Sequence, residues 1–331
     1  MTLLTNKAKT LLTGGGIAAA GFAVCGAMSA AVTKKLVNTA MDRNAPLNLT
    51  QNRSRFSGSV VRATSMVEAK AAKESLERRD SRTIEITSHD GIPLTGHWLA
   101  CKSPERIILA MHGWRSSWSA DFGIISDFWH QQNCSVLYAE QRGQGASGGD
   151  YMSFGLIECR DCLDWLHWIN QQTGGTLPIY LAGVSMGAST VLMASALNLP
   201  ENVCGILADC GYTSVHAIWK HVAEHNLHLS YNIHSPFADR LCKKKIHTGT
   251  KDYSTTEALK TNHTPVLFVH GTEDRFVPVE MTYENYQACS APKRLFIVPG
   301  AGHGMSYFVD RPGYERETKD FWASCEKTRK P

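Results

Sequence analysis

Residues 178–187 read Pro-Ile-Tyr-Leu-Ala-Gly-Val-Ser-Met-Gly, an apolar run that passes directly into a serine flanked by glycines. The run Pro178–Ala182 predicts a strand that is buried on both faces of a sheet. From Met186 onward the chain is rich in alanine and apolar residues, which predicts a helix. Ser185 therefore lies in a sharp strand-to-helix turn between Gly183 and Gly187. In that context a Gly-x-Ser-x-Gly pattern indicates a nucleophilic serine.

On both sides of this stretch, short apolar runs alternate with helical patterns. The runs that predict strands are 83–87, 94–99, 106–111, 135–139, 178–182, 203–208, 265–269 and 294–298. The helical patterns include Phe154–Ile169 and Met186–Leu197. The first two runs alternate in polarity around Asp90-Gly91, which is typical of a hairpin. The sequence therefore predicts an α/β architecture with a mostly parallel sheet after an antiparallel start.

Composition limits the classes of function. The chain has 331 residues, 43% of them hydrophobic and 19% charged, which suits one large domain with a sizeable core. Its formal net charge of +4 is spread along the chain, so no nucleic-acid partner is predicted. Ten cysteines are scattered through it. Cys159 and Cys162 form a lone Cys-x-x-Cys without a second pair at zinc-ribbon spacing, and no metal site is predicted.

The N-terminus carries no charge between Lys9 and Lys34, and this stretch is long enough to cross a bilayer as a helix. We therefore expect residues 1–36 to be a transmembrane or signal-anchor segment that locates the protein to the membrane, with its orientation undetermined. A cleaved signal peptide of a secreted protein and a soluble helix are the alternatives. Residues 37–80 are predicted to be an irregular linker followed by a helix over Ser65–Arg79, and residues 81–331 the α/β domain.

A serine nucleophile needs a base, and the base needs a carboxylate to orient it. His303 lies in a glycine-rich loop after the last predicted strand, and Asp274 follows the strand before it. The order Ser185, Asp274, His303 matches the chain order known for this kind of turn. Asp209, at the end of the run 203–208, is the alternative acid, and Glu273 is a more remote one.

Hydrolysis by such a triad also needs two N–H donors that bind the developing oxyanion. The backbone N–H of Met186, directly after the nucleophile, is the first candidate. The second is that of Trp114, in the sequence His112-Gly113-Trp114 that follows the run 106–111. The Trp114 side chain either lines the substrate pocket or packs in the core.

The motifs together resemble the α/β-hydrolase superfamily over residues 82–327. His112-Gly113-Trp114 is similar to its oxyanion loop, Arg142–Ser147 to its Arg-Gly-x-Gly-x-Ser turn, Gly183–Gly187 to its nucleophile turn, and Gly271–Asp274 to its acid loop. Within the superfamily the chain resembles the serine aminopeptidase-like (S33-type) branch, which includes many membrane-anchored bacterial hydrolases. The resemblance implies a mostly parallel sheet with helices on both faces, a short helical cap at about residues 212–262, and chemistry without cofactor or metal.

The predicted function is hydrolysis of carboxylic esters with small to medium acyl groups through an acyl-enzyme. Two alternatives remain open: an aminopeptidase or amidase with the same triad, and a non-catalytic, membrane-tethered binding protein of the same fold. The expected partner is a small-molecule ester or amide, with the membrane contacted through the N-terminal segment.

Overall fold

The computed structural model describes residues 28–46 and 63–328. Eight strands form one sheet in the order β1-β2-β4-β3-β5-β6-β7-β8. They are β1 (Arg82–Thr87), β2 (Pro93–Leu99), β3 (Arg106–Met111), β4 (Cys134–Ala139), β5 (Ile179–Val184), β6 (Val203–Asp209), β7 (Val266–Gly271) and β8 (Lys293–Val298). β1 and β2 are antiparallel to their neighbours, and all pairs from β4 to β8 are parallel. The α/β-hydrolase fold predicted from the sequence is confirmed.

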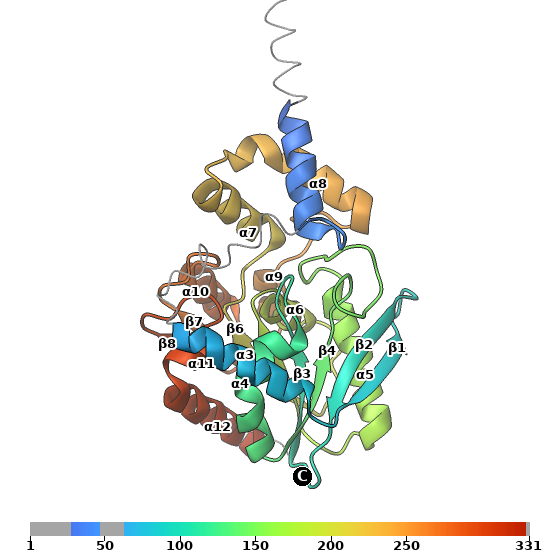
Figure 1. Cartoon of the computed structure of the whole chain (residues 1–331), viewed down its shortest axis with the longest axis vertical. Helices are drawn as coiled ribbons and strands as arrows, with labels where there is room; N and C mark the ends of the chain where they lie inside the picture. The colour runs from blue at the N-terminus through green and yellow to red at the C-terminus, as the bar shows by residue number, and fades with distance from the viewer. Residues whose placement is uncertain (1–27, 47–62, 329–331) are drawn as a thin grey trace, which may run out of the picture.

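Helices cover both faces of this sheet (Figure 1). They are α3 (Ala63–Glu77), α4 (Trp118–Gln131), α5 (Glu158–Thr173), α6 (Met186–Ala194), α7 (Val215–His221), the π-helix η2 (Val222–Asn226), α8 (Tyr231–Ile246), α9 (Thr255–Lys260), α10 (Val279–Ala288), α11 (Ser306–Val309) and α12 (Arg311–Thr328). The expected cap, residues 212–262, contains α7, η2, α8 and α9.

Alternate side chains of the central strands pack into two separate cores. In β3, Ile107 and Leu109 belong to the core beneath α5 and α6, whereas Ile108 belongs to the core beneath α3, α4 and α12. Both faces of the strand are therefore buried, which explains why its sequence is a continuous apolar run. The chain reverses its direction across the sheet between β3 and β5, so the loops after these two strands lie side by side. A site is expected at such a point, beyond the carboxyl ends of the strands.

The N-terminal region differs from the prediction. Among the helices of residues 28–46 and 63–328, none combines the length and the apolar character needed to cross a membrane. The predicted membrane location and single N-terminal span are therefore wrong for this part of the chain, and its helices do not support the membrane as a partner. The part of the predicted span over residues 1–27 lies outside the described residues.

The helix that ends the predicted N-terminal segment continues beyond residue 36 into the predicted linker, as far as Met41. Residues 28–41 are helical, and Thr33, Val37 and Met41 are buried on one side of this helix. These three residues are four positions apart, so they form a stripe along one helical face. The polar residues between them hid this period from an interpretation based on composition.

Candidate active site

Ser185 stands between β5 and α6 in a strained backbone conformation. Its φ of 57° and ψ of −116° lie outside the regions that residues other than glycine usually adopt. The flanking glycines are required by space. A Cβ on Gly183 would lie 2.3 Å from the Gly187 carbonyl oxygen, and one on Gly187 would lie 1.8 Å from that of Met111. The predicted sharp turn is therefore present, and it projects Ser185 from the carboxyl end of β5.

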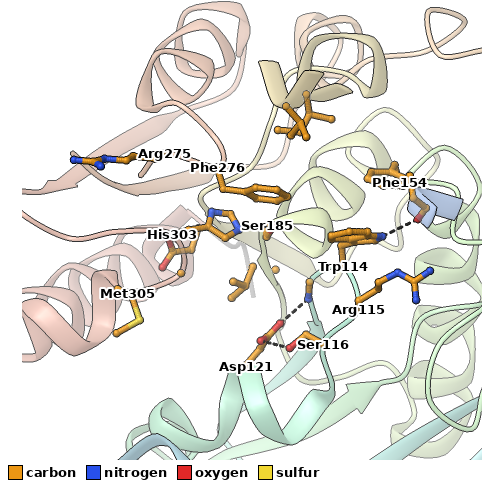
Figure 2. A pocket seen from close by; sticks show the side chains of 18 of the residues that line it. Trp114, Arg115, Ser116, Asp121, Phe154, Ser185, Arg275, Phe276, His303 and Met305 are labelled. Carbon is orange, nitrogen blue, oxygen red and sulfur yellow. Dashed lines mark hydrogen bonds between the residues drawn. The ribbon is translucent and has the colours of Figure 1, made fainter. Parts of the chain in front are cut away.

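His303 connects Ser185 to Asp274. Its Nε2 lies 2.9 Å from Ser185 Oγ, and its Nδ1 lies 2.7 Å from Asp274 Oδ2. A carboxylate oxygen only accepts, so Nδ1 carries the proton and Nε2 is left to accept one from the serine hydroxyl. Figure 2 shows the His303 ring directed at Ser185. The structure thus brings together the three residues that the sequence nominated.

The carboxylate and the imidazole shift each other's ionisation. Burial would raise the pKa of Asp274, but the charge of His303 and hydrogen bonds from His303 and His270 outweigh it and hold that pKa well below its usual range. Burial would lower the pKa of His303, but the Asp274 carboxylate outweighs it and raises this pKa. Asp274 is therefore ionised, and it stabilises the protonated form of His303.

A second histidine fixes Asp274 from the other side. His270 Nε2 lies 3.1 Å from Asp274 Oδ2 and 2.9 Å from the Val277 carbonyl oxygen. Both partners are acceptors, so Nε2 carries the proton, and Nδ1 receives the hydroxyl proton of Thr282 at 2.6 Å. The backbone N–H groups of Phe276 and Val277 donate to the other Asp274 oxygen, each at 2.9 Å. His270 thus has a structural role, holding the Asp274 carboxylate in place.

The other two candidate acids do not contact His303. Asp209 is buried at the end of β6, where it accepts a hydrogen bond from Ser306 Oγ at 3.1 Å. Burial raises its pKa, with the charge of His270 acting in the opposite direction. Glu273 is exposed.

The loop after β3 lies against Ser185. A Cβ on Gly113 would lie 3.3 Å from Ser185 Cβ, so the absence of a side chain allows this approach. His112 fixes the loop, because its Nδ1 donates to the Gly113 carbonyl at 2.8 Å and its Nε2 accepts from Gln141 N–H at 3.2 Å. Asp121 of α4 accepts from Gly113 N–H at 2.7 Å.

Trp114 does both things that its side chain was expected to do. Its indole lines the cavity above Ser185 and packs against Phe276 and Phe154, with ring centroids 6.3 and 6.1 Å away (Figure 2). Its Nε1 donates to the Ala40 carbonyl at 2.8 Å. Phe276 in turn packs on the His303 ring, with centroids 5.1 Å apart.

The site opens into a cavity of about 940 Å³. Its walls come from helix 28–41, the loop after β3, the cap elements α7, η2 and α8, and the segment around α11. Sequence reasoning missed three contributors to this region: Asp121, Phe276 and helix 28–41. The available signals were an acidic residue four positions after Ser117, the N-cap of α4, an aromatic residue two positions after Asp274, and the four-residue spacing of Thr33, Val37 and Met41.

Among the residues that the structure describes, two groups of three side chains bring potential metal ligands within 4.8 Å of one another: Cys210, Asp274 and His303, and His89, Asp161 and Asp164. In the first group Asp274 and His303 bond to each other, and burial raises the pKa of Cys210 well above its usual value. In the second, Asp161 is paired with Arg142. A metal in either group would have to displace these contacts, and in the first group it would also have to ionise the buried Cys210 thiol.

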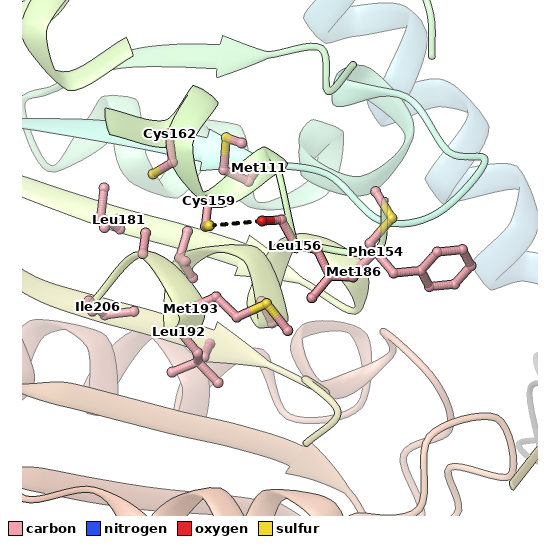
Figure 3. Packing of buried hydrophobic residues seen from close by; sticks show 14 of the residues in the cluster. Met111, Phe154, Leu156, Cys159, Cys162, Leu181, Met186, Leu192, Met193 and Ile206 are labelled. Carbon is pink, nitrogen blue, oxygen red and sulfur yellow. Dashed lines mark hydrogen bonds between the residues drawn. The ribbon is translucent and has the colours of Figure 1, made fainter. Parts of the chain in front are cut away.

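The Cys-x-x-Cys pair lies in the core rather than at a site. Cys159 and Cys162 are on the face of α5 that packs against α6 (Figure 3). Burial raises the pKa of Cys159 to about 12 and raises that of Cys162 as well. The Cys159 thiol is 3.5 Å from the Leu156 carbonyl oxygen, to which it donates. Both residues therefore behave as small apolar side chains.

Known proteins resemble this chain over most of its length. The Bacillus subtilis protein YqkD is 26% identical, over 75% of this chain and 81% of its own. Among solved structures, the Pyrococcus furiosus esterase Pf2001 matches with a TM-score of 0.63 at 20% identity, over 76% of this chain and 93% of the esterase. The Pyrococcus horikoshii acylaminoacyl peptidase matches with a TM-score of 0.56 at 14% identity, over 76% of this chain and 43% of the peptidase. These two likenesses support the fold.

The family comparison covers more than half of the chain. The prolyl oligopeptidase family matches residues 120–328, a range that includes the serine turn, all three candidate acids and His303. This supports a hydrolase, while the finer resemblance to the serine aminopeptidase-like branch stays a prediction. The chain belongs to the prolyl oligopeptidase family.

Proposed function

We propose that the protein is a serine hydrolase that cleaves carboxylic esters through an acyl-enzyme on Ser185. The observation that carries this proposal is the continuous chain of hydrogen bonds from Ser185 Oγ through His303 to Asp274, at 2.9 and 2.7 Å. It stands at the carboxyl edge of the sheet and beside a large cavity, where a substrate carbonyl has access to the hydroxyl.

The reaction follows from the protonation states of these side chains. His303 Nε2 takes the hydroxyl proton as Ser185 Oγ bonds to the ester carbonyl carbon. The tetrahedral intermediate collapses, the C–O bond to the alcohol breaks, and His303 returns the proton to the leaving oxygen. Water then attacks the acyl-enzyme with His303 again as base, releasing the acid and restoring the serine. Asp274 holds the His303 ring and stabilises its cationic form.

For the oxyanion we propose the backbone N–H groups of Met186 and Trp114. Met186 is the first residue of α6, where the N-terminal N–H groups of a helix favour negative charge. The close approach of Gly113 to Ser185 supports the second donor, because Trp114 is the next residue. Loss of one such donor typically raises the barrier by about 3 kcal/mol.

An ester is favoured over a peptide with a free amino terminus because of the charges in the cavity. Among its described lining residues the carboxylates are Asp121 and Asp209, and both accept hydrogen bonds from the protein. A substrate ammonium group would therefore have to share a carboxylate that already accepts hydrogen bonds from the protein. Glu224 and Asp239, the acidic cap residues, do not line the cavity. The alternative of an amidase is still supported by the match to the prolyl oligopeptidase family and by the likeness in fold to the acylaminoacyl peptidase.

A substrate panel separates these activities. We expect p-nitrophenyl esters to be hydrolysed. We also expect alanine p-nitroanilide to be cleaved at least about tenfold faster when its amino group is acetylated than when it is free. A tenfold difference corresponds to a cost of about 1.4 kcal/mol for burying the charged amino group. The measurement is kcat/KM for each compound. A preference for the free amine would identify an aminopeptidase.

The pH dependence of ester hydrolysis reports on His303. Only the neutral imidazole accepts the Ser185 proton, so kcat/KM rises with pH through the pKa of His303 and is lost below it. Because Asp274 raises this pKa against the opposing effect of burial, the acidic limb is expected above the ordinary value of about 6.5. The measurement is kcat/KM between pH 5 and 9 in buffers of constant ionic strength. A limb centred below 6.5 would contradict the assigned pairing.

A further inference from the structure

The helix over residues 28–41 forms part of the cavity wall. It contributes Thr33, Leu36, Val37, Thr39 and Ala40 to the lining. These positions fall on one face of the helix. Lys34 and Lys35, on the other side, are exposed. In Figure 1 this helix is the blue segment that lies beside α8, above the loops at the carboxyl edge of the sheet.

The C-terminal end of this helix is fixed to the loop that carries the proposed oxyanion donor. The Arg115 guanidinium donates to the carbonyl oxygens of Thr39 at 2.9 Å and Asp42 at 2.6 Å. The Trp114 indole donates to the Ala40 carbonyl at 2.8 Å. These carbonyls belong to the last turn and the end of the helix, where a helix leaves its acceptors unsatisfied and favours a cation.

The other end of the helix is joined to the cap. Thr33 Oγ1 lies 2.7 Å from His234 Nδ1 on α8 and donates its own proton to the Ser29 carbonyl at 2.7 Å. The hydroxyl has one proton, so His234 Nδ1 is the donor in their bond. With both ends tied, the helix is a fixed wall of the cavity.

We propose that helix 28–41 selects the acyl group of the substrate, and that the group it accepts is an uncharged, elongated aliphatic chain of medium length. The inference rests on the proposed ester hydrolysis at Ser185. The residues that helix 28–41 contributes to the cavity lining include Leu36, Val37 and Ala40, and none of them is charged. The cavity, at about 940 Å³, is near the upper end of ordinary ligand sites and far larger than an acetyl group needs.

Chain-length preference tests the wall directly. Each methylene that the wall covers should raise kcat/KM by about fourfold, so p-nitrophenyl octanoate is expected to exceed the acetate. Leu36→Trp fills the cavity from the helix, and we expect it to lower the octanoate-to-acetate ratio by at least about tenfold, the effect of excluding two methylenes. Lys35→Ala, on the exposed face of the same helix, is the matched control and should keep the wild-type ratio within about twofold.

A binding measurement separates this inference from the proposed chemistry. In the Ser185→Ala background, methyl octanoate should bind by isothermal titration calorimetry, and Leu36→Trp should weaken that binding at least about tenfold. Thermal unfolding shows whether each variant is folded. If folded Leu36→Trp has the same octanoate-to-acetate ratio as its parent and binds methyl octanoate equally well, the proposed role of helix 28–41 is contradicted, even if the esterase activity is confirmed. If the wild-type protein binds methyl octanoate but hydrolyses no ester, the proposed ester hydrolysis is contradicted and the proposed binding by helix 28–41 is not.

Discussion

Replacing Ser185 with alanine is expected to lower kcat for ester hydrolysis by at least ~10⁴-fold. The Ser185 hydroxyl is the atom that bonds to the substrate carbonyl in the proposed reaction, and its hydrogen bond to His303 is the means of its activation. Alanine keeps the Cβ in the strained turn and adds no atoms, so Gly183 and Gly187 keep their contacts. The measurement is kcat with p-nitrophenyl octanoate, together with circular dichroism and thermal unfolding.

The control for this variant is its stability, which should stay within about 1 kcal/mol of the wild type because alanine removes only the hydroxyl group of the Ser185 side chain. A folded Ser185→Ala protein that hydrolyses esters at the wild-type rate would place the activity elsewhere. Absence of any hydrolase activity in the wild type would favour the remaining alternative, a binding protein that keeps the fold.

Asp274→Asn is expected to lower kcat by about 10⁴-fold, the size found when such an acid is made neutral in other triads. The asparagine amide can donate to His303 Nδ1, which would place the imidazole proton on Nε2 and prevent it from accepting the proton of Ser185. The loss of charge also removes the interaction that raises the pKa of His303. The residual activity should therefore have its acidic limb at lower pH than the wild type. The measurement is kcat and its pH profile.

Asp209→Asn is the matched control, because it makes the same isosteric change in the other buried candidate acid. Asp209 accepts a hydrogen bond from Ser306, whereas His303 Nδ1 bonds to Asp274, so we expect a loss of less than about tenfold. The charge of Asp209 also raises the pKa of His303, but less than that of Asp274 does, so the acidic limb should move to lower pH by less than in Asp274→Asn. The reverse order, with a large loss in Asp209→Asn and a small one in Asp274→Asn, would assign the acid to β6 instead of β7.

The sheet was predictable because its central strands are buried on both sides. Each apolar run that was interpreted as a strand corresponds to one, and Leu181 and Ile108 show why: both are fully enclosed by opposite layers of helices. The ends of the helices were predicted less accurately. The helix predicted at Phe154 begins at Glu158, because Phe154 has a φ of 58° and Glu158 accepts from the backbone N–H groups of Ser153 and Gly155.

Local motifs predicted the residues proposed to react, whereas contacts between distant segments formed the rest of the site. Ser185 and His303 lie in glycine-rich turns that the sequence displays directly. The choice between Asp274 and Asp209 depended on which strand end faces the imidazole, and this is a matter of tertiary geometry. The contact of Arg115 with the carbonyls of Thr39 and Asp42 joins positions more than seventy residues apart through backbone oxygens, and any sequence supplies such acceptors. The membrane prediction failed for the described residues because it rested on the absence of charged residues before Lys34. It overlooked the buried stripe of Thr33, Val37 and Met41.

Reaction of the folded wild-type protein with a fluorophosphonate, followed by mass spectrometry of its peptides, tests the assignment of the nucleophile most directly. The reagent phosphonylates a serine only when a base and an oxyanion site activate it. The account predicts one adduct, on Ser185, and its loss in Ser185→Ala. A folded wild-type protein without an adduct, or an adduct on another serine that persists in Ser185→Ala, would contradict it.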